Sequence, residues 1–346
     1  LPAYKAGQKL QPRDGLEVFK LSSNENTFAP LPSVLEAINE ASENINRYPD
    51  PFNTEMIYAI ANSIGVKSEN IAVGTGSVAV LGHLIQAMAG NGDEVIYPCR
   101  SFEAYPIWMQ LCGVSGIPIS LKSDNSHDLE AMAAAVTPKT KMIIVCTPNN
   151  PTGNAISAVE LHKFMDAVPK NVLVVIDEAY EDFVTDPQMV AGMDFFTTYE
   201  NVALLRTFSK AQGLAGMRVG YTVAQPEIAD FVRRVSLPFG VNILAQAAVV
   251  ASLSEKAKKE LKARVDAISN MRDEMLSQLR DAGWKIGSQH ANFFWVNTKH
   301  VEKLKNACEE AGVAVRPFPE GVRITIGEPE ANARILKVLT EFPDKN

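Results

Sequence analysis

Two short segments of this chain are apolar at every position, and they constrain its fold more than any other feature. Met142-Ile-Ile-Val-Cys146 and Val172-Leu-Val-Val-Ile176 place apolar side chains on both faces of an extended strand. Such strands are typical of a mostly parallel sheet that helices cover on both sides. The pattern therefore predicts an α/β fold. Further strands are expected at 71–73, 94–97, 202–206 and 218–223, and helices at 78–89, 127–135, 158–168 and 227–235.

The pattern changes at both ends of the chain, and this predicts three parts. Residues 1–30 are rich in proline, which favours an extended arm that packs with the C-terminal part. A long helical stretch is expected from about 243 to 282. Strands at 292–296 and 322–326 then indicate a smaller α+β unit, closed by a helix near 331–341. We expect an N-terminal arm over 1–30, a large domain over 31–242 and a small domain over 243–346.

Charge and composition exclude several classes of protein. The 346 residues include 33 Lys and Arg against 40 Asp and Glu, so no basic face for nucleic acid or an anionic membrane is expected. No apolar run reaches the roughly 18 residues of a membrane span, and no signal-peptide pattern is present. The four cysteines are far apart, and no histidine pair has the spacing of a metal site. We therefore expect a cytoplasmic protein without a metal.

Two glycine-containing turns follow expected strands. Gly74-Thr-Gly-Ser-Val-Ala79 opens a helix, and its backbone N–H groups could bind a phosphate. A purely structural turn is the alternative. A nicotinamide site is disfavoured, because the acids Asp93 and Glu94 precede the next strand instead of following it. Thr147-Pro-Asn-Asn-Pro-Thr-Gly153 is a rigid turn at the carboxyl end of a strand, where open α/β sheets bind ligands.

Two further motifs carry ionisable side chains. Asp177-Glu-Ala-Tyr180 directly follows a buried strand, although a helix cap would also explain an acid there. Arg206-Thr-Phe-Ser-Lys210 places a lysine among small and hydroxyl residues, a setting that can lower the lysine pKa and favour a Schiff base. A phosphate site, an acid for a ring nitrogen and a reactive lysine together match pyridoxal 5'-phosphate.

Over nearly its whole length the chain resembles the fold-type I aminotransferases of the histidinol-phosphate aminotransferase subfamily. The resemblance rests on motifs in family order: Leu1-Pro-Ala-Tyr4, Leu21-Ser-Ser-Asn-Glu-Asn26, Arg47-Tyr-Pro-Asp-Pro51, Asn149-Asn-Pro-Thr-Gly153, Asp177-Glu-Ala-Tyr180, Thr207-Phe-Ser-Lys210, Gly213-Leu-Ala-Gly-Met-Arg218 and Arg323-Ile-Thr-Ile-Gly327. Tyr97–Tyr105 and Arg316–Arg323 look like the bacterial aromatic-amino-acid branch. The resemblance implies a mostly parallel, seven-stranded sheet sandwiched by helices, plus a smaller α+β domain.

The resemblance also implies roles for residues at the cofactor. Lys210 would form the Schiff base with pyridoxal phosphate and then act as acid and base. Asp177 would hold the ring nitrogen protonated, Tyr180 and Asn150 would contact the phenolic oxygen, and Phe102 would stack on the ring. The phosphate would be held by the glycine turn, by the segment around Lys210 and by the second subunit of a homodimer: Gly76, Ser77, Val78, Thr207, Ser209, Arg218 and the partner subunit's Tyr48.

The resemblance places substrate-binding residues at both ends of the chain. Arg323 would bind the substrate carboxylate, and Arg316, Asn24 and Tyr4 would line the same pocket. The segment between the two arginines is short and apolar, which favours an aromatic side chain. We expect transamination between Phe, Tyr or Trp and a 2-oxo acid such as 2-oxoglutarate. Histidinol phosphate is the main alternative substrate. A decarboxylating lyase and a non-catalytic regulator are further alternatives.

Overall fold

The computed structural model describes residues 7, 10–11 and 15–345, and its centre is a seven-stranded sheet. Six strands run in one direction, and β8 runs antiparallel to its two neighbours, β2 and β7. The sheet order is β2 (Ile71–Gly74), β8 (Gly220–Val223), β7 (Val202–Thr207), β6 (Leu173–Asp177), β5 (Thr140–Cys146), β3 (Glu94–Cys99) and β4 (Ser115–Ser120). The α/β class and the seven-stranded, mostly parallel sheet are therefore confirmed.

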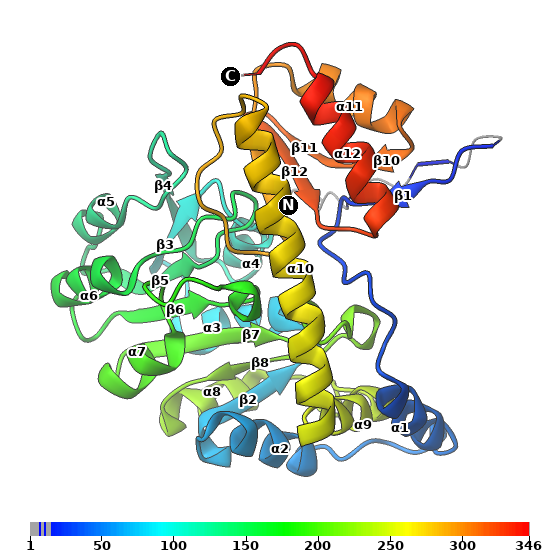
Figure 1. Ribbon diagram of the computed structural model, residues 1–346. Coiled ribbons are helices and arrows are strands. Elements are labelled where there is room, and N and C mark those ends of the chain that lie inside the picture. The colour runs from blue at the N-terminus through cyan, green and yellow to red at the C-terminus, as the bar shows by residue number, and fades with distance from the viewer. Residues whose placement is uncertain (1–6, 8–9, 12–14, 346) are drawn as a thin grey trace.

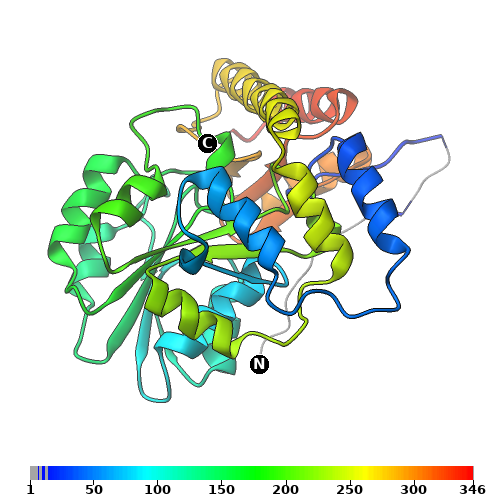
Figure 2. The same cartoon turned by 90° about the horizontal axis from the view of Figure 1, so that it is seen from below.

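The two apolar segments form β5 and β6 and are buried on both faces. Along β5, Ile143 and Val145 belong to one core cluster, while Met142 and Ile144 belong to another on the opposite face. This alternation is what a strand with two covered faces requires. The two orthogonal views show helices on both faces of the sheet (Figures 1 and 2).

The helices divide between the two faces of this sheet. One face is covered by α3 (Ser77–Met88), α4 (Ala104–Leu111) and α8 (Pro226–Val235). The other packs against α2 (Thr54–Ile64), α5 (Leu129–Ala134), α6 (Ala158–Ala167), α7 (Gly192–Thr198) and α9 (Ile243–Ser252), with α1 (Pro32–Ser42) beside α9. No helix in the described part of the chain is both long and apolar enough to span a membrane.

The predicted helical stretch from 243 to 282 is two helices, α9 and α10 (Glu255–Asp281). The break falls at Leu253–Ser254, where the Ser254 hydroxyl accepts a hydrogen bond from the Ala257 amide and so caps α10. Figure 1 shows α10 running from α9 to the C-terminal part of the molecule.

The C-terminal part contains a second sheet with the order β11 (Arg316–Phe318), β12 (Gly321–Thr325) and β9 (Phe293–Asn297). Helices α11 (Val301–Glu310) and α12 (Pro329–Glu341) pack with it. A short strand of the N-terminal segment, β1 (Phe19–Lys20), pairs in parallel with β10 (Val313–Ala314). This pairing attaches the N-terminal segment that contains β1 to the C-terminal part of the molecule.

Candidate active site

One cavity of about 420 Å³ lies at the carboxyl edge of the large sheet. Residues at or just after the ends of β2, β3, β5, β6 and β7 line it, as expected for a ligand site in an open α/β sheet. Segments before β8, after β1 and on β11 and β12 complete its walls. The structure thus brings together thirteen of the site residues expected from sequence: Asn24, Ser77, Val78, Phe102, Asn150, Asp177, Tyr180, Thr207, Ser209, Lys210, Arg218, Arg316 and Arg323.

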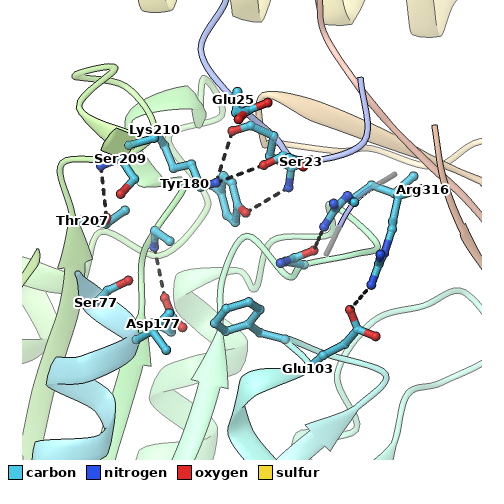
Figure 3. A pocket seen from close by; sticks show the side chains of 18 of the residues that line it. Ser23, Glu25, Ser77, Glu103, Asp177, Tyr180, Thr207, Ser209, Lys210 and Arg316 are labelled. Carbon is cyan, nitrogen blue, oxygen red and sulfur yellow. Dashed lines mark hydrogen bonds and ion pairs between the residues drawn. The ribbon is translucent and has the colours of Figure 1, made fainter. Parts of the chain in front are cut away.

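Lys210 follows β7, and its amine points toward the N-terminal segment (Figure 3). Its Nζ donates to the Asn24 carbonyl at 3.2 Å and lies 5.6 Å from the centroid of the Tyr180 ring. Burial, followed by the positive charge of Arg323, lowers the pKa of Lys210 to about 7. A large fraction of the amine is therefore neutral near neutral pH and can act as a nucleophile or base.

Asp177 is the last residue of β6, and its carboxylate is almost completely buried. The Tyr105 hydroxyl donates to Oδ2 at 2.7 Å, and the Ala179 amide donates to Oδ1 at 3.3 Å. Burial raises the pKa of Asp177 to about 6, although the bond from Tyr105 opposes this rise. A buried carboxylate in this setting favours a cationic partner, such as a protonated ring nitrogen.

Tyr105 belongs to the site, but sequence analysis gave it no role. It lies on α4, and its ring packs edge-on against Phe102 with 5.7 Å between centroids. One side chain therefore contacts both the expected stacking ring and the expected ring-nitrogen acid. Tyr105 and Asp177 are 72 positions apart in the chain, so no sequence motif indicates this contact.

The turn before α3 forms a cradle that suits a phosphate. Gly76 has φ 87°, and a Cβ added there would lie 2.5 Å from Arg218 Nη2, so a glycine is needed for conformation and space. Arg218 also adopts a left-handed φ of 56° and donates to the Ala215 carbonyl at 2.9 Å. Its guanidinium has no acidic partner among the residues that the structure describes. Ser77, at the helix N-terminus, and Ser209 line the cavity beside it.

A hydrogen-bonded network connects the N-terminal segment with the opposite wall of the cavity. Asn24 Nδ2 donates to the Tyr180 hydroxyl at 3.0 Å, and burial raises the pKa of that phenol. Arg323 donates to the Ser22 carbonyl at 2.7 Å and to Asn150 Oδ1. These contacts place Arg323 between the N-terminal segment and the Asn150 turn.

Three expected site residues are not among those that line the cavity. Gly76 does not line the cavity but precedes Ser77, which does. Tyr48 is 82% exposed and packs against Phe239, with 4.7 Å between ring centroids. Tyr4 lies outside the described residues. Conversely, Ser23, Glu25 and Glu103 line the cavity, although their sequence motifs assigned them no role.

The donor set supports an organic, phosphorylated cofactor. A desolvated amine, a buried carboxylate and a cationic cradle at a helix N-terminus face one cavity, as an aldehyde, a basic ring nitrogen and a phosphate would require. Among the described residues, no cluster of three or more His, Cys, Asp or Glu side chains could hold a metal ion.

Known proteins are similar to this chain in both sequence and fold. The family model "Aminotransferase class I and II" matches residues 17–339. The chain is 47% identical to the aromatic amino acid aminotransferase of Streptomyces coelicolor, over 99% of this chain and 95% of that protein. Its identity to the enzyme of the same name from Thermobifida fusca is also 47%, over 100% and 96% of the two chains.

Two solved structures extend this comparison. A putative histidinol-phosphate aminotransferase from Erwinia carotovora atroseptica has a TM-score of 0.87 at 25% identity, covering 98% of each chain. Histidinol-phosphate aminotransferase from Sinorhizobium meliloti, in complex with pyridoxal-5'-phosphate, has a TM-score of 0.84 at 27% identity, covering 94% of this chain and 91% of that one. The family and fold type expected from sequence are confirmed: the chain belongs to the class I and II aminotransferases and has their fold-type I architecture.

Proposed function

We propose that this aminotransferase uses pyridoxal 5'-phosphate to transfer the amino group of Phe, Tyr or Trp to a 2-oxo acid such as 2-oxoglutarate. The observation that carries the proposal is the buried Lys210, whose pKa is lowered to about 7 in the cavity that also holds Asp177 and Arg218. Relatives at 43–47% identity bear the name aromatic amino acid aminotransferase. Their name supports the substrate class.

Four groups of the chain would hold the cofactor. Lys210 would bind its aldehyde carbon, and Asp177 would hold a proton on its ring nitrogen. Phe102 would cover one face of the ring, and Arg218 would bind the phosphate, helped by the residues of the cradle: Gly76, Ser77, Val78, Thr207 and Ser209. Bound there, pyridoxal phosphate supplies an electrophilic carbon for the amino group and a ring that accepts electrons.

The remaining residues would bind and orient the substrate. Arg323 presents a guanidinium that can bind a carboxylate through two parallel hydrogen bonds. Phe318 lies 5.9 Å from that guanidinium and offers an apolar wall for an aromatic side chain. Lys210 Nζ would act as base and then as acid, moving the proton from the substrate Cα to the aldehyde carbon of the cofactor. Asn24, which donates to the Tyr180 hydroxyl, would line the substrate side of the cavity, while Tyr180 and Asn150 would contact the phenolic oxygen of the cofactor.

We also propose that the enzyme is a homodimer in which the partner subunit's Tyr48 reaches the phosphate. Tyr48 and the Phe239 ring that it contacts are exposed, as are large apolar side chains near them in the sequence, which is unusual for a surface that faces solvent. The latter include Ile45, Phe52 and Leu237. Light scattering of the purified protein should give twice the 37.7 kDa chain mass.

The proposal extends to domain organisation and location. The pairing of β1 with β10 supports an arm over 1–30 that packs with a small domain over 243–346, beside a large domain over 31–242. All four cysteines are free, which fits the reducing cytoplasm.

A single-turnover experiment tests the substrate. The cofactor-loaded protein is mixed with L-phenylalanine or L-histidinol phosphate, and the cofactor absorbance and the 2-oxo product are followed together. Rapid conversion by phenylalanine, with release of phenylpyruvate, is expected. Conversion by histidinol phosphate alone would refute the aromatic substrate and leave the family assignment intact.

A further inference from the structure

Two arginines occupy directly opposed positions on neighbouring strands of the small sheet. Arg316 on β11 and Arg323 on β12 are cross-strand partners, and both are buried, with exposed fractions of 8% and 7%. Like charges at opposed positions destabilise a sheet, so nearby acceptors have to compensate them. The two guanidinium groups receive different compensation.

Arg323 faces neutral oxygens, whereas Arg316 faces a full negative charge. Arg323 donates to the Ser22 carbonyl and to Asn150 Oδ1. Arg316 Nη2 forms an ion pair with Glu103 Oε2 at 2.7 Å (Figure 3). The cavity therefore presents one arginine that donates to two neutral oxygens and one arginine that forms an ion pair with a carboxylate.

Glu103 is well placed to hold this charge at the cavity wall. It directly precedes α4 and follows Phe102, and its carboxylate does not cap the helix. Its acceptor oxygens are therefore available to the guanidinium across the cavity. Phe318 lies 5.5 Å from the Arg316 guanidinium and covers that side with an aromatic ring.

We propose that Glu103 is a specificity-determining residue that competes for Arg316 with a second anionic group on the substrate. An aromatic amino acid has one carboxylate for Arg323 and leaves the Glu103–Arg316 pair intact. A dicarboxylic or phosphorylated substrate must displace Glu103 from Arg316, so its binding is weakened but not abolished. The inference rests on the proposed function, because it assumes that substrates bind by a carboxylate at Arg323.

Binding of two unreactive analogues to the cofactor-loaded enzyme tests this competition. Glutarate carries two carboxylates, and 3-phenylpropionate carries one carboxylate and a ring; calorimetry gives both dissociation constants. In Glu103→Gln we expect glutarate to bind about tenfold more tightly and 3-phenylpropionate to change less than about twofold. Glu320→Gln is the matched control, because Glu320 forms an ion pair with Arg100 at 2.7 Å and neither residue lines the cavity.

Kinetics and two further variants complete the test. The KM for L-glutamate should fall in Glu103→Gln while its kcat stays near the wild-type value. The gain for glutarate should disappear in the double variant Glu103→Gln/Arg316→Gln. If Glu103→Gln does not fold, Glu103→Asp should give a smaller gain in glutarate affinity, because a shorter carboxylate reaches Arg316 less well.

Two results would overturn the inference: equal changes for glutarate and 3-phenylpropionate, or a glutarate gain that persists without Arg316. If phenylalanine is not a substrate of the wild-type enzyme, the proposed function fails. The glutarate titrations of the variants still decide the role of Glu103 in that case.

Discussion

Replacing Tyr105 by phenylalanine removes one hydroxyl group from the centre of the site and leaves the packing nearly unchanged. The hydroxyl donates to Asp177 Oδ2 at 2.7 Å. The ring, which packs edge-on against Phe102, is retained in the variant. Tyr105→Phe therefore tests the hydrogen bond separately from the shape of the pocket.

The size of the effect follows from the charge on Asp177. A hydrogen bond to a charged group contributes about 1.5–3 kcal/mol, and one pKa unit corresponds to about 1.4 kcal/mol. The bond stabilises the ionised carboxylate, so its loss raises the pKa. From the value of about 6 in the intact protein, the pKa of Asp177 should rise to between about 7 and 8.

The pH dependence of kcat/KM for phenylalanine measures this change. In the proposed mechanism Asp177 must be ionised to hold the proton on the ring nitrogen, so the acid limb should move to higher pH by about one pH unit or more. A protonated ring nitrogen of the cofactor would lower the pKa of Asp177 in both proteins, so the experiment compares the two acid limbs with each other.

Tyr97→Phe is the control for this experiment. Its ring lies 6.4 Å from that of Tyr105, and its hydroxyl makes no contact with Asp177. Its acid limb should match that of the wild type. An unchanged acid limb in a folded Tyr105→Phe enzyme, or the same shift in Tyr97→Phe, would refute the reasoning.

Three other predictions concern the cofactor and acid stability. Lys210→Ala should abolish phenylpyruvate formation, and turnover at the normal rate would exclude Lys210 as the reactive amine. Phe102→Ala should weaken cofactor binding about tenfold through loss of ring stacking, measured by titrating the apo-protein; unchanged affinity would exclude that contact. His127 is buried with neither ring nitrogen hydrogen-bonded, and burial lowers its pKa to about 4. The unfolded chain therefore binds a proton that the folded protein does not as pH falls below about 6.5, and stability is lost down to about pH 4. His127→Leu should remove about 2 kcal/mol of the stability lost between pH 7 and pH 5 in urea unfolding, and an undiminished loss would contradict this account.

The central sheet could be predicted because the apolar pattern that indicates each strand lies within the residues of that strand. The two wholly apolar segments become β5 and β6, and their alternate residues face opposite core clusters. The antiparallel direction of β8 was not predicted, because strand direction depends on the connection between strands and not on the strand residues. The break before Ser254 was missed because one capping serine interrupts an otherwise continuous helical pattern.

The residues to which we assign the chemistry were also predictable, but several of their partners were not. Lys210 and Asp177 each lie at or near the end of an expected strand, where sequence alone indicates a ligand site. The contacts of Tyr105 with Asp177 and of Glu103 with Arg316 join residues 72 and 213 positions apart. No periodicity or motif spacing encodes such contacts, because they depend on how the small sheet and α4 pack around the cavity.

The reversed direction of β8 has a consequence for the size of the ligand. Because β8 runs antiparallel to β7, a single connection between them enters and leaves at the same edge of the sheet, and it carries both Lys210 and Arg218. Buried Phe208, Leu214 and Val219 anchor this connection in the core, and the Leu214 amide donates to the Phe208 carbonyl at 2.9 Å. The connection thus fixes the distance between the Lys210 amine and the phosphate cradle. This distance would have to match the distance between the aldehyde and the phosphate of the cofactor. An insertion within the connection would therefore change which phosphorylated aldehydes fit.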